Sequence, residues 1–203
     1  VKCIGFYLGG VKCIGRKIKT IESSITSAFI KADTKLQLIN VQAPEIITSS
    51  VHREQKIKIK MEVDIDPPDQ FNTEAKILLA PIPFTVNTYT LDCLFAGKMH
   101  ALLCRSWQNR VKGRDWYDLV WYLSQNIELN LKHLEVRLQQ SGHLEMQQSL
   151  DEVLLQNMLC KKINGLDIVS AKKDISPFIT HPDSIDIWSK EFFHAIVKKI
   201  KIS

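Results

Sequence analysis

A short stretch in the middle of the chain is unusually rich in side chains that could bind an anion. The segment NRVKGRDWYDLVWYL, residues 109–123, holds three basic residues and then two acids: Arg110, Lys112, Arg114, Asp115 and Asp118. Guanidinium and ammonium groups beside a helix N-terminus suit a triphosphate. A surface turn whose acids complement the helix dipole explains the same residues equally well. Both interpretations stay open at this point.

Two more basic residues precede this stretch on a predicted helix. From Thr90, a good N-cap, Leu91, Leu94, Phe95, Met99 and Leu102 recur at three- and four-residue steps. Lys98 and Arg105 are seven residues apart, nearly two turns, so both project from one side of this helix. We expect them to join Lys112 and Arg114, with Asp115 and Asp118 orienting Arg110 or Arg114.

A second group of candidate ligands lies on a predicted strand. In KIKIKMEVDID, residues 56–66, apolar and charged residues alternate with period two, which is typical of a half-buried strand. Glu62, Asp64 and Asp66 therefore share one face. They are close enough to hold a hard cation such as Mg²⁺. Alternatively, they keep a solvent-facing strand soluble.

Other elements are needed to position these residues. VKCIG at 1–5 recurs at 11–15, and Gly9-Gly10 between the copies predicts a hairpin. ESSITSAFIKADT, residues 22–34, fits helix or strand, whereas KILLAPIPF, residues 76–84, predicts one short strand. A second helix is expected from Arg114, with Trp116, Leu119, Val120 and Leu123 on its apolar stripe.

The remaining segments read as helical, apart from one. Amphipathic patterns cover about 131–140, 144–160 and 184–199, and INGLDIVSAKKDISPFI, residues 163–179, reads as a loop or short strand. The expected fold class is α+β, with a β-rich part at 1–89 and a helical region at 90–203. Tyr117 and Trp121, four residues apart, either face a groove or pack between helices. The histidines show no metal-ligand spacing.

Composition excludes several classes of protein. The chain has 203 residues, 45% of them hydrophobic and 24% charged, which is typical of a globular protein. No apolar run is long enough to span a membrane, and no secretory leader is recognisable. Five cysteines without a CxxC pair indicate free thiols, and hence a cytoplasmic protein. The net charge of +5 is compatible with nucleotide or nucleic-acid partners.

The sequence resembles the AbiEii/AbiGii toxin family of nucleotidyltransferases. The run LFAGKMHALLCRSWQNRVKGRDWYDLVWYL, residues 94–123, is similar to the family's closing motif, a Lys, a downstream Arg and a Lys-x-Arg-Asp-x-Tyr-Asp element. The matching positions are Lys98, Arg105, Lys112, Arg114, Asp115, Tyr117 and Asp118. Upstream, KIKIKMEVDIDPP resembles the strand that carries the third active-site acid, and Lys31 matches a basic residue before it. The likeness runs from about Ile21 to the C-terminus.

The resemblance implies a small mixed β-sheet flanked by helices, with a helical C-terminal region. The implied reaction transfers a nucleoside monophosphate from an NTP to an acceptor, RNA or protein, with two Mg²⁺ ions held by carboxylates. Glu62 or Asp64 would be the third acid. The resemblance assigns nucleotide or phosphate binding to Lys31, Lys98, Arg105, Lys112 and Arg114, and structural or catalytic support to Asp115 or Asp118. Many family members are toxins paired with an antitoxin.

One family motif is not found in the sequence. The Gly-Gly or Gly-Ser turn followed by Asp-x-Asp supplies two of the three metal ligands, and no acidic residue follows Gly9-Gly10 at the expected distance. Asp64-Ile-Asp66 is an Asp-x-Asp, but it lies in the third-acid strand. We therefore expect a truncated N-terminus. The chain is then either a nucleotidyltransferase toxin whose first motif lies upstream, or an inactive remnant that binds a nucleotide or a partner.

Overall fold

The computed structural model describes residues 7–8, 11–14, 25–33, 56–64, 66–80, 82–106 and 111–203. The chain divides into two compact units, Val1–Pro67 and Pro68–Ser203. Arg110, the first copy of VKCIG and the Gly9-Gly10 turn lie outside the described residues.

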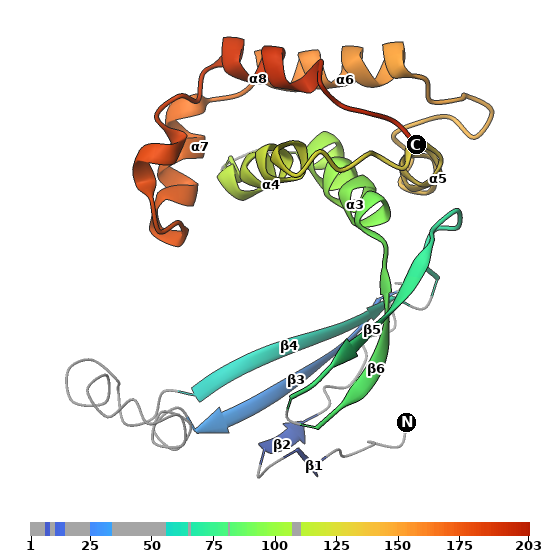
Figure 1. Cartoon of the computed structure of the whole chain (residues 1–203), viewed down its shortest axis with the longest axis vertical. Helices are drawn as coiled ribbons and strands as arrows, with labels where there is room; N and C mark the ends of the chain where they lie inside the picture. The colour runs from blue at the N-terminus through green and yellow to red at the C-terminus, as the bar shows by residue number, and fades with distance from the viewer. Residues whose placement is uncertain are drawn as a thin grey trace. The chain divides into compact units, whose positions relative to one another are not determined.

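The first unit contains a four-stranded sheet in the order β1-β2-β3-β4 (Figure 1). Its strands are β1 (Tyr7–Leu8), β2 (Val11–Ile14), β3 (Ile25–Asp33) and β4 (Lys56–Asp64). Each neighbouring pair is antiparallel. The predicted hairpin is confirmed, because Leu8 pairs with Val11. The strand predicted at 56–66 is also confirmed, and the ambiguous segment 22–34 contains a strand.

The second unit begins with a hairpin of β5 (Thr73–Leu78) and β6 (Phe84–Tyr89). The prediction of one strand over 76–84 was wrong, because the chain turns within that segment. Pro81 and Pro83 lack a backbone N–H and cannot take part as donors in a continuous ladder. Every non-proline residue from Ile77 to Phe84 is apolar, and this continuous apolar run concealed the break.

Helices make up the rest of the second unit, which confirms the α+β class. They are α3 (Leu91–Cys104), α4 (Gly113–Ser124), α5 (Leu131–Gln140), α6 (Glu152–Asn164), α7 (Ile168–Ile175) and α8 (Lys190–Val197). Helix α3 packs against α4 and α5, α4 packs against α7, and α6 packs against α8 (Figure 1). None of the helices in the described part of the chain is long and apolar enough to cross a membrane.

Side-chain caps define where most of these helices begin. Asn130, Asp151, Asp167 and Ser189 each accept a hydrogen bond from the backbone N–H three residues ahead. The interpretation of 163–179 as a loop or strand was therefore wrong, because Asp167 starts α7 there. Thr90 precedes α3 as predicted, but its hydroxyl donates to the Asn72 carbonyl oxygen instead of capping the helix.

The core of the second unit is one apolar cluster drawn from all six helices. Its largest fully buried side chains include Phe95, Met99, Trp116, Leu119 and Phe193. The predicted stripe of α3 was only partly right. Leu91 and Leu94 are 41% and 40% exposed, whereas neighbouring positions of the same helix are buried: Cys93, Ala96 and Leu103. Helix α3 has packing partners on several sides, so its buried surface is broader than a single stripe.

Candidate functional site

The closing-motif residues line one open pocket of the second unit. Its volume is about 450 Å³, and the residues come from α3, α4 and the end of α7. The lining residues are Lys98, Arg105, Lys112, Arg114, Asp115, Tyr117, Asp118, Ile175, Phe178 and Ile179. The expectation that Lys98 and Arg105 of α3 join Lys112 and Arg114 is thus met by the fold. We call this site the basic pocket.

Two cations of the basic pocket are held by carboxylates of α4. The Arg105 guanidinium donates to both oxygens of Asp115, at 3.0 and 2.7 Å, and the Lys98 ammonium lies 2.7 Å from Asp118 Oδ2. The acids were expected to orient Arg110 or Arg114, and for Arg114 this was wrong. Because α3 packs against α4, Lys98 and Arg105 lie close enough to Asp118 and Asp115 to form ion pairs with them. Burial raises the pKa of Asp115, although Arg105 and Lys112 oppose that shift.

The other two cations of the basic pocket have no carboxylate within ion-pair distance among the described residues. These are Lys112 and Arg114. The Arg114 guanidinium lies over the Phe178 ring, 5.3 Å from its centroid, which fixes the side chain without neutralising it. With two acids and four cations, the basic pocket carries a net charge of +2. Lys112 and Arg114 supply the charge available to an anion.

The N-terminus of α4 differs from the phosphate-binding arrangement suggested by the sequence. The Gly113 N–H donates to Asp174 Oδ2 of α7 at 3.1 Å, so a carboxylate already occupies this donor. Helix α7 also comes very close here, since a Cβ at Gly113 would lie 2.0 Å from the Ala171 carbonyl oxygen. Gly113 therefore has a second role besides separating two helices. It lets α7 approach and bring Phe178 to Arg114.

The aromatic residues of DWYDLVWYL divide between core and surface. Trp116 is fully buried, as predicted, and the centroid of its ring lies 4.7 Å from that of the Phe193 ring. Tyr117 and Trp121 are 36% and 44% exposed, so packing between helices does not describe them. Tyr117 lines the basic pocket, as the groove interpretation required.

A comparison with models of protein families assigns the chain to one of them. Residues 13–192 match the family model described as "Nucleotidyl transferase AbiEii toxin, Type IV TA system". The chain belongs to the AbiEii family. The match spans the first unit from β2 onward and most of the second unit, including the whole basic pocket. Searches of curated proteins and of solved structures return no significant match.

The upstream AbiEii positions lie on the sheet of the first unit. Glu62 and Asp64 belong to β4, where they pair in register with Ser27 and Ile25 of β3. Asp64 is exposed, and its Oδ1 accepts a hydrogen bond from the Asp66 backbone N–H at 3.1 Å. Lys31 of β3 pairs in register with Lys12 on one side and Lys58 on the other.

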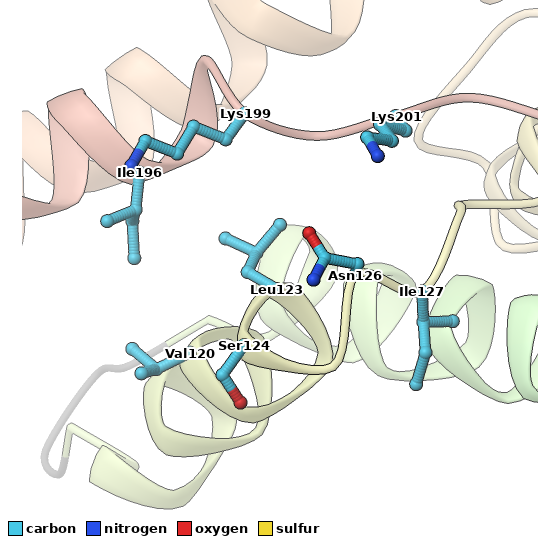
Figure 2. Close-up of a pocket in the computed structure, with 8 residues that line it drawn as sticks. All are labelled: Val120, Leu123, Ser124, Asn126, Ile127, Ile196, Lys199 and Lys201. Carbon is cyan, nitrogen blue, oxygen red and sulfur yellow. The ribbon is translucent and has the colours of Figure 1, made fainter.

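A second, smaller pocket of about 220 Å³ has a different character. Figure 2 shows its lining residues, which come from the end of α4, the following segment and the C-terminal part of the chain: Val120, Leu123, Ser124, Asn126, Ile127, Ile196, Lys199 and Lys201. Half of them are aliphatic, and none is acidic. None of the seven positions that match the closing motif lines this pocket, so we do not assign nucleotide binding to it.

Sequence reasoning missed two features of the second unit. Asp174 and Phe178 contact the first residues of α4, and both belong to a segment for which the sequence predicted a loop or short strand. His100, Cys104 and His143 lie together, although their spacing along the chain gave no metal signature. Only the i, i+4 relation of His100 and Cys104 could have pointed to this cluster.

Proposed function

We propose that this AbiEii protein transfers a nucleoside monophosphate from an Mg·NTP to a hydroxyl group of an RNA or protein acceptor. The acceptor oxygen forms a bond to the α-phosphorus as the bond from that phosphorus to the bridging oxygen breaks. Pyrophosphate leaves, and the hydroxyl proton passes to solvent or base. The observation that carries the proposal is the single pocket that collects the four cations of the closing motif.

In this proposal the four cations have two roles. Lys112 and Arg114 bind the β- and γ-phosphates directly, because their charges are not balanced by a described carboxylate. Lys98 and Arg105 neutralise charge that develops on the leaving pyrophosphate. Asp115 and Asp118 act as positioning residues, since each already binds one of those cations. Cations fixed before the substrate arrives need little reorganisation in the transition state.

A divalent metal would be held by acids of β4. Mg²⁺ takes oxygen ligands, and Asp64 presents an exposed carboxylate of which only Oδ1 accepts the Asp66 N–H. Glu62 is two residues earlier on the same strand. Asp115 fits a metal poorly, because Arg105 binds both of its oxygens, and Lys98 already binds Oδ2 of Asp118. Mg²⁺ supplies Lewis-acid chemistry, which polarises phosphate oxygens and activates a hydroxyl group.

Family membership also supports a proposal about the role of the protein in the cell. The family's description names a toxin of a toxin–antitoxin system. We therefore propose that the protein acts in the cytoplasm as such a toxin, with a cognate antitoxin as its protein partner.

The first test is nucleotide binding. Isothermal titration of each Mg·NTP into the purified chain should show binding that weakens in Lys112→Ala and in Arg114→Ala. Loss of one charge-assisted contact, about 1.5–3 kcal/mol, corresponds to roughly 10- to 100-fold in Kd. Lys132→Ala is the matched control, since Lys132 is an exposed lysine of α5 outside the basic pocket.

Two results would contradict the proposed site. One is a folded chain that binds none of the four Mg·NTPs. The other is binding that weakens equally in Lys112→Ala and Lys132→Ala, which would indicate non-specific attraction to positive charge. Where binding is seen, transfer of label from an α-labelled NTP to RNA or protein then tests the reaction itself.

A further inference from the structure

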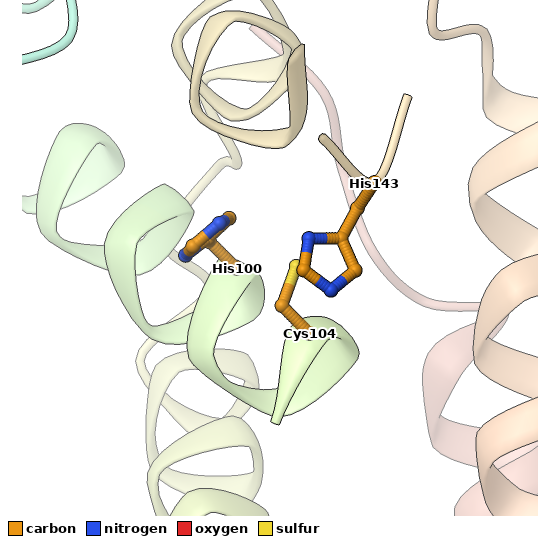
Figure 3. A group of neighbouring side chains, drawn as sticks. All are labelled: His100, Cys104 and His143. Atoms are coloured by element: carbon orange, nitrogen blue, oxygen red, sulfur yellow. The ribbon is translucent and has the colours of Figure 1, made fainter. Parts of the chain in front are cut away.

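Three potential soft-metal ligands converge on the side of α3 that faces away from the basic pocket. His100 and Cys104 lie four residues apart on α3, and His143 comes from the segment that follows α5 (Figure 3). Their ligand atoms, one from each residue, all lie within 4.8 Å of one another. At about 100° per residue, His100 is rotated by roughly 200° from Lys98, so the two groups project from opposite sides of the helix.

The two imidazoles already converge on a single point. The Ser141 hydroxyl oxygen lies 2.9 Å from His100 Nε2 and 2.9 Å from His143 Nδ1, which directs both nitrogens into the same small space. The Cys104 Sγ lies within 4.8 Å of a ring nitrogen of each histidine (Figure 3). Ligand atoms of a tetrahedral Zn²⁺ site are roughly 3.3–3.8 Å apart, given Zn–N of about 2.0 Å and Zn–S of about 2.3 Å. An adjustment of about 1 Å would therefore close the site, and His143 is exposed on a segment without regular structure.

We propose that His100, Cys104 and His143 bind a Zn²⁺ ion, or a similar borderline-soft divalent metal, with water or the Ser141 hydroxyl as fourth ligand. Two imidazoles and a thiolate are ligands of Zn²⁺, whereas Mg²⁺ takes oxygen. This ion is therefore distinct from any metal held by the acids of β4. On binding, the Cys104 thiol loses its proton to solvent and a Zn–S bond forms.

The surroundings of the cluster affect the imidazole and the thiol in opposite ways. Burial, together with the nearby Arg137 and His143, lowers the pKa of His100 to about 4, so its imidazole is neutral near pH 7 and free to ligate. Burial raises the pKa of the Cys104 thiol, and this shift opposes ligation, because the metal binds the thiolate and must displace its proton. The bound ion would tie α3 to the segment after α5. It would thereby stiffen the helix whose other side presents Lys98 and Arg105.

The test is metal binding by the untagged full chain after removal of metal with a chelator. Titration with Zn²⁺ should give one ion per chain at this site, and Co²⁺ should give a sulfur-to-cobalt charge-transfer band. Cys104→Ser should abolish that band, and Cys104→Ser and His143→Ala should each weaken Zn²⁺ binding by more than 10-fold, the least that loss of a direct ligand should cost. Cys160→Ser is the matched control, because Cys160 is another partly buried free cysteine outside the cluster.

His143→Ala keeps the test decisive even if a substitution on α3 disturbs folding, since His143 is exposed. Circular dichroism confirms that each variant is folded. A folded wild-type chain that binds no Zn²⁺ would overturn the proposal. So would an affinity that stays unchanged in both Cys104→Ser and His143→Ala, because the ion would then occupy other ligands. Excess Mg²⁺ that displaces the Zn²⁺ would also overturn it.

Discussion

Replacing Gly113 with alanine should destabilise the second unit, although alanine is the better helix former. Gly113 is the first residue of α4 and is buried. A Cβ there would lie 2.0 Å from the Ala171 carbonyl oxygen and 3.2 Å from Ile175 Cβ. A carbon and a carbonyl oxygen approach to about 3.3 Å at closest. Helix α7 must therefore move by about 1 Å or more, because a backbone atom cannot rotate away.

The size of the effect follows from three terms. Overpacking of this kind costs about 1–3 kcal/mol. Displacing α7 also breaks the Gly113 N–H to Asp174 hydrogen bond, which costs about 1.5–3 kcal/mol because the acceptor is charged. The better helix propensity of alanine returns at most about 1 kcal/mol. Mid-range values give a net loss of about 3 kcal/mol in the free energy of unfolding.

Gly97→Ala provides the matched control with the opposite sign. Gly97 lies inside α3, and a Cβ there would meet nothing closer than Arg137 Cζ at 3.7 Å, an ordinary contact. Without a clash, helix propensity alone should stabilise the chain by about 0.5–1 kcal/mol.

Urea denaturation followed by circular dichroism measures both variants. At constant m, the midpoint should fall for Gly113→Ala and rise slightly for Gly97→Ala. A Gly113→Ala variant within about 0.5 kcal/mol of wild type, the usual scatter of surface changes, would refute the close approach of α4 and α7.

Three further outcomes follow from the same contacts. Trp116→Ala should cost about 3–5 kcal/mol by urea denaturation, because it empties the fully buried site against Phe193. Arg105→Ala should cost about 1–3 kcal/mol by leaving buried Asp115 without its described cation, and adding Asp115→Asn should recover part of that loss. Burial lowers the pKa of His133 below its ordinary 6.5 in the folded state. The unfolded chain therefore binds more protons at acid pH, and the free energy of unfolding should fall as pH drops below 6.5. A His133→Gln variant should lose part of this pH dependence, and the remainder should come from His100, whose pKa is lowered to about 4 in the folded chain.

The structure explains why protonating His133 is unfavourable. Its Nδ1 donates to the Asp69 carbonyl oxygen at 2.7 Å, so the neutral ring has its lone pair on Nε2. That nitrogen accepts the Arg137 Nε–H at 2.9 Å. A second proton would place an N–H against a guanidinium donor. Asp92 favours the charged ring, but its effect is smaller than that of burial.

Local patterns in the sequence were sufficient for the elements that carry the closing motif. Period-two alternation predicted β4, and apolar periodicity predicted where α3 and α4 begin to within one residue. The spacing of Lys98 and Arg105 correctly placed both on one side of α3. The residues of the motif also indicated the AbiEii family, which the match over 13–192 confirms. These features depend on neighbours along the chain, and the sequence records neighbours directly.

Features that depend on distant segments required the three-dimensional structure. The ion pairs of Lys98 and Arg105 join α3 to α4 across 20 and 10 residues, and the Gly113 bond to Asp174 spans 61. His100 and His143 meet at Ser141 because α5 packs against α3. Periodicity can show which residues face a core, but helix packing determines which of them meet.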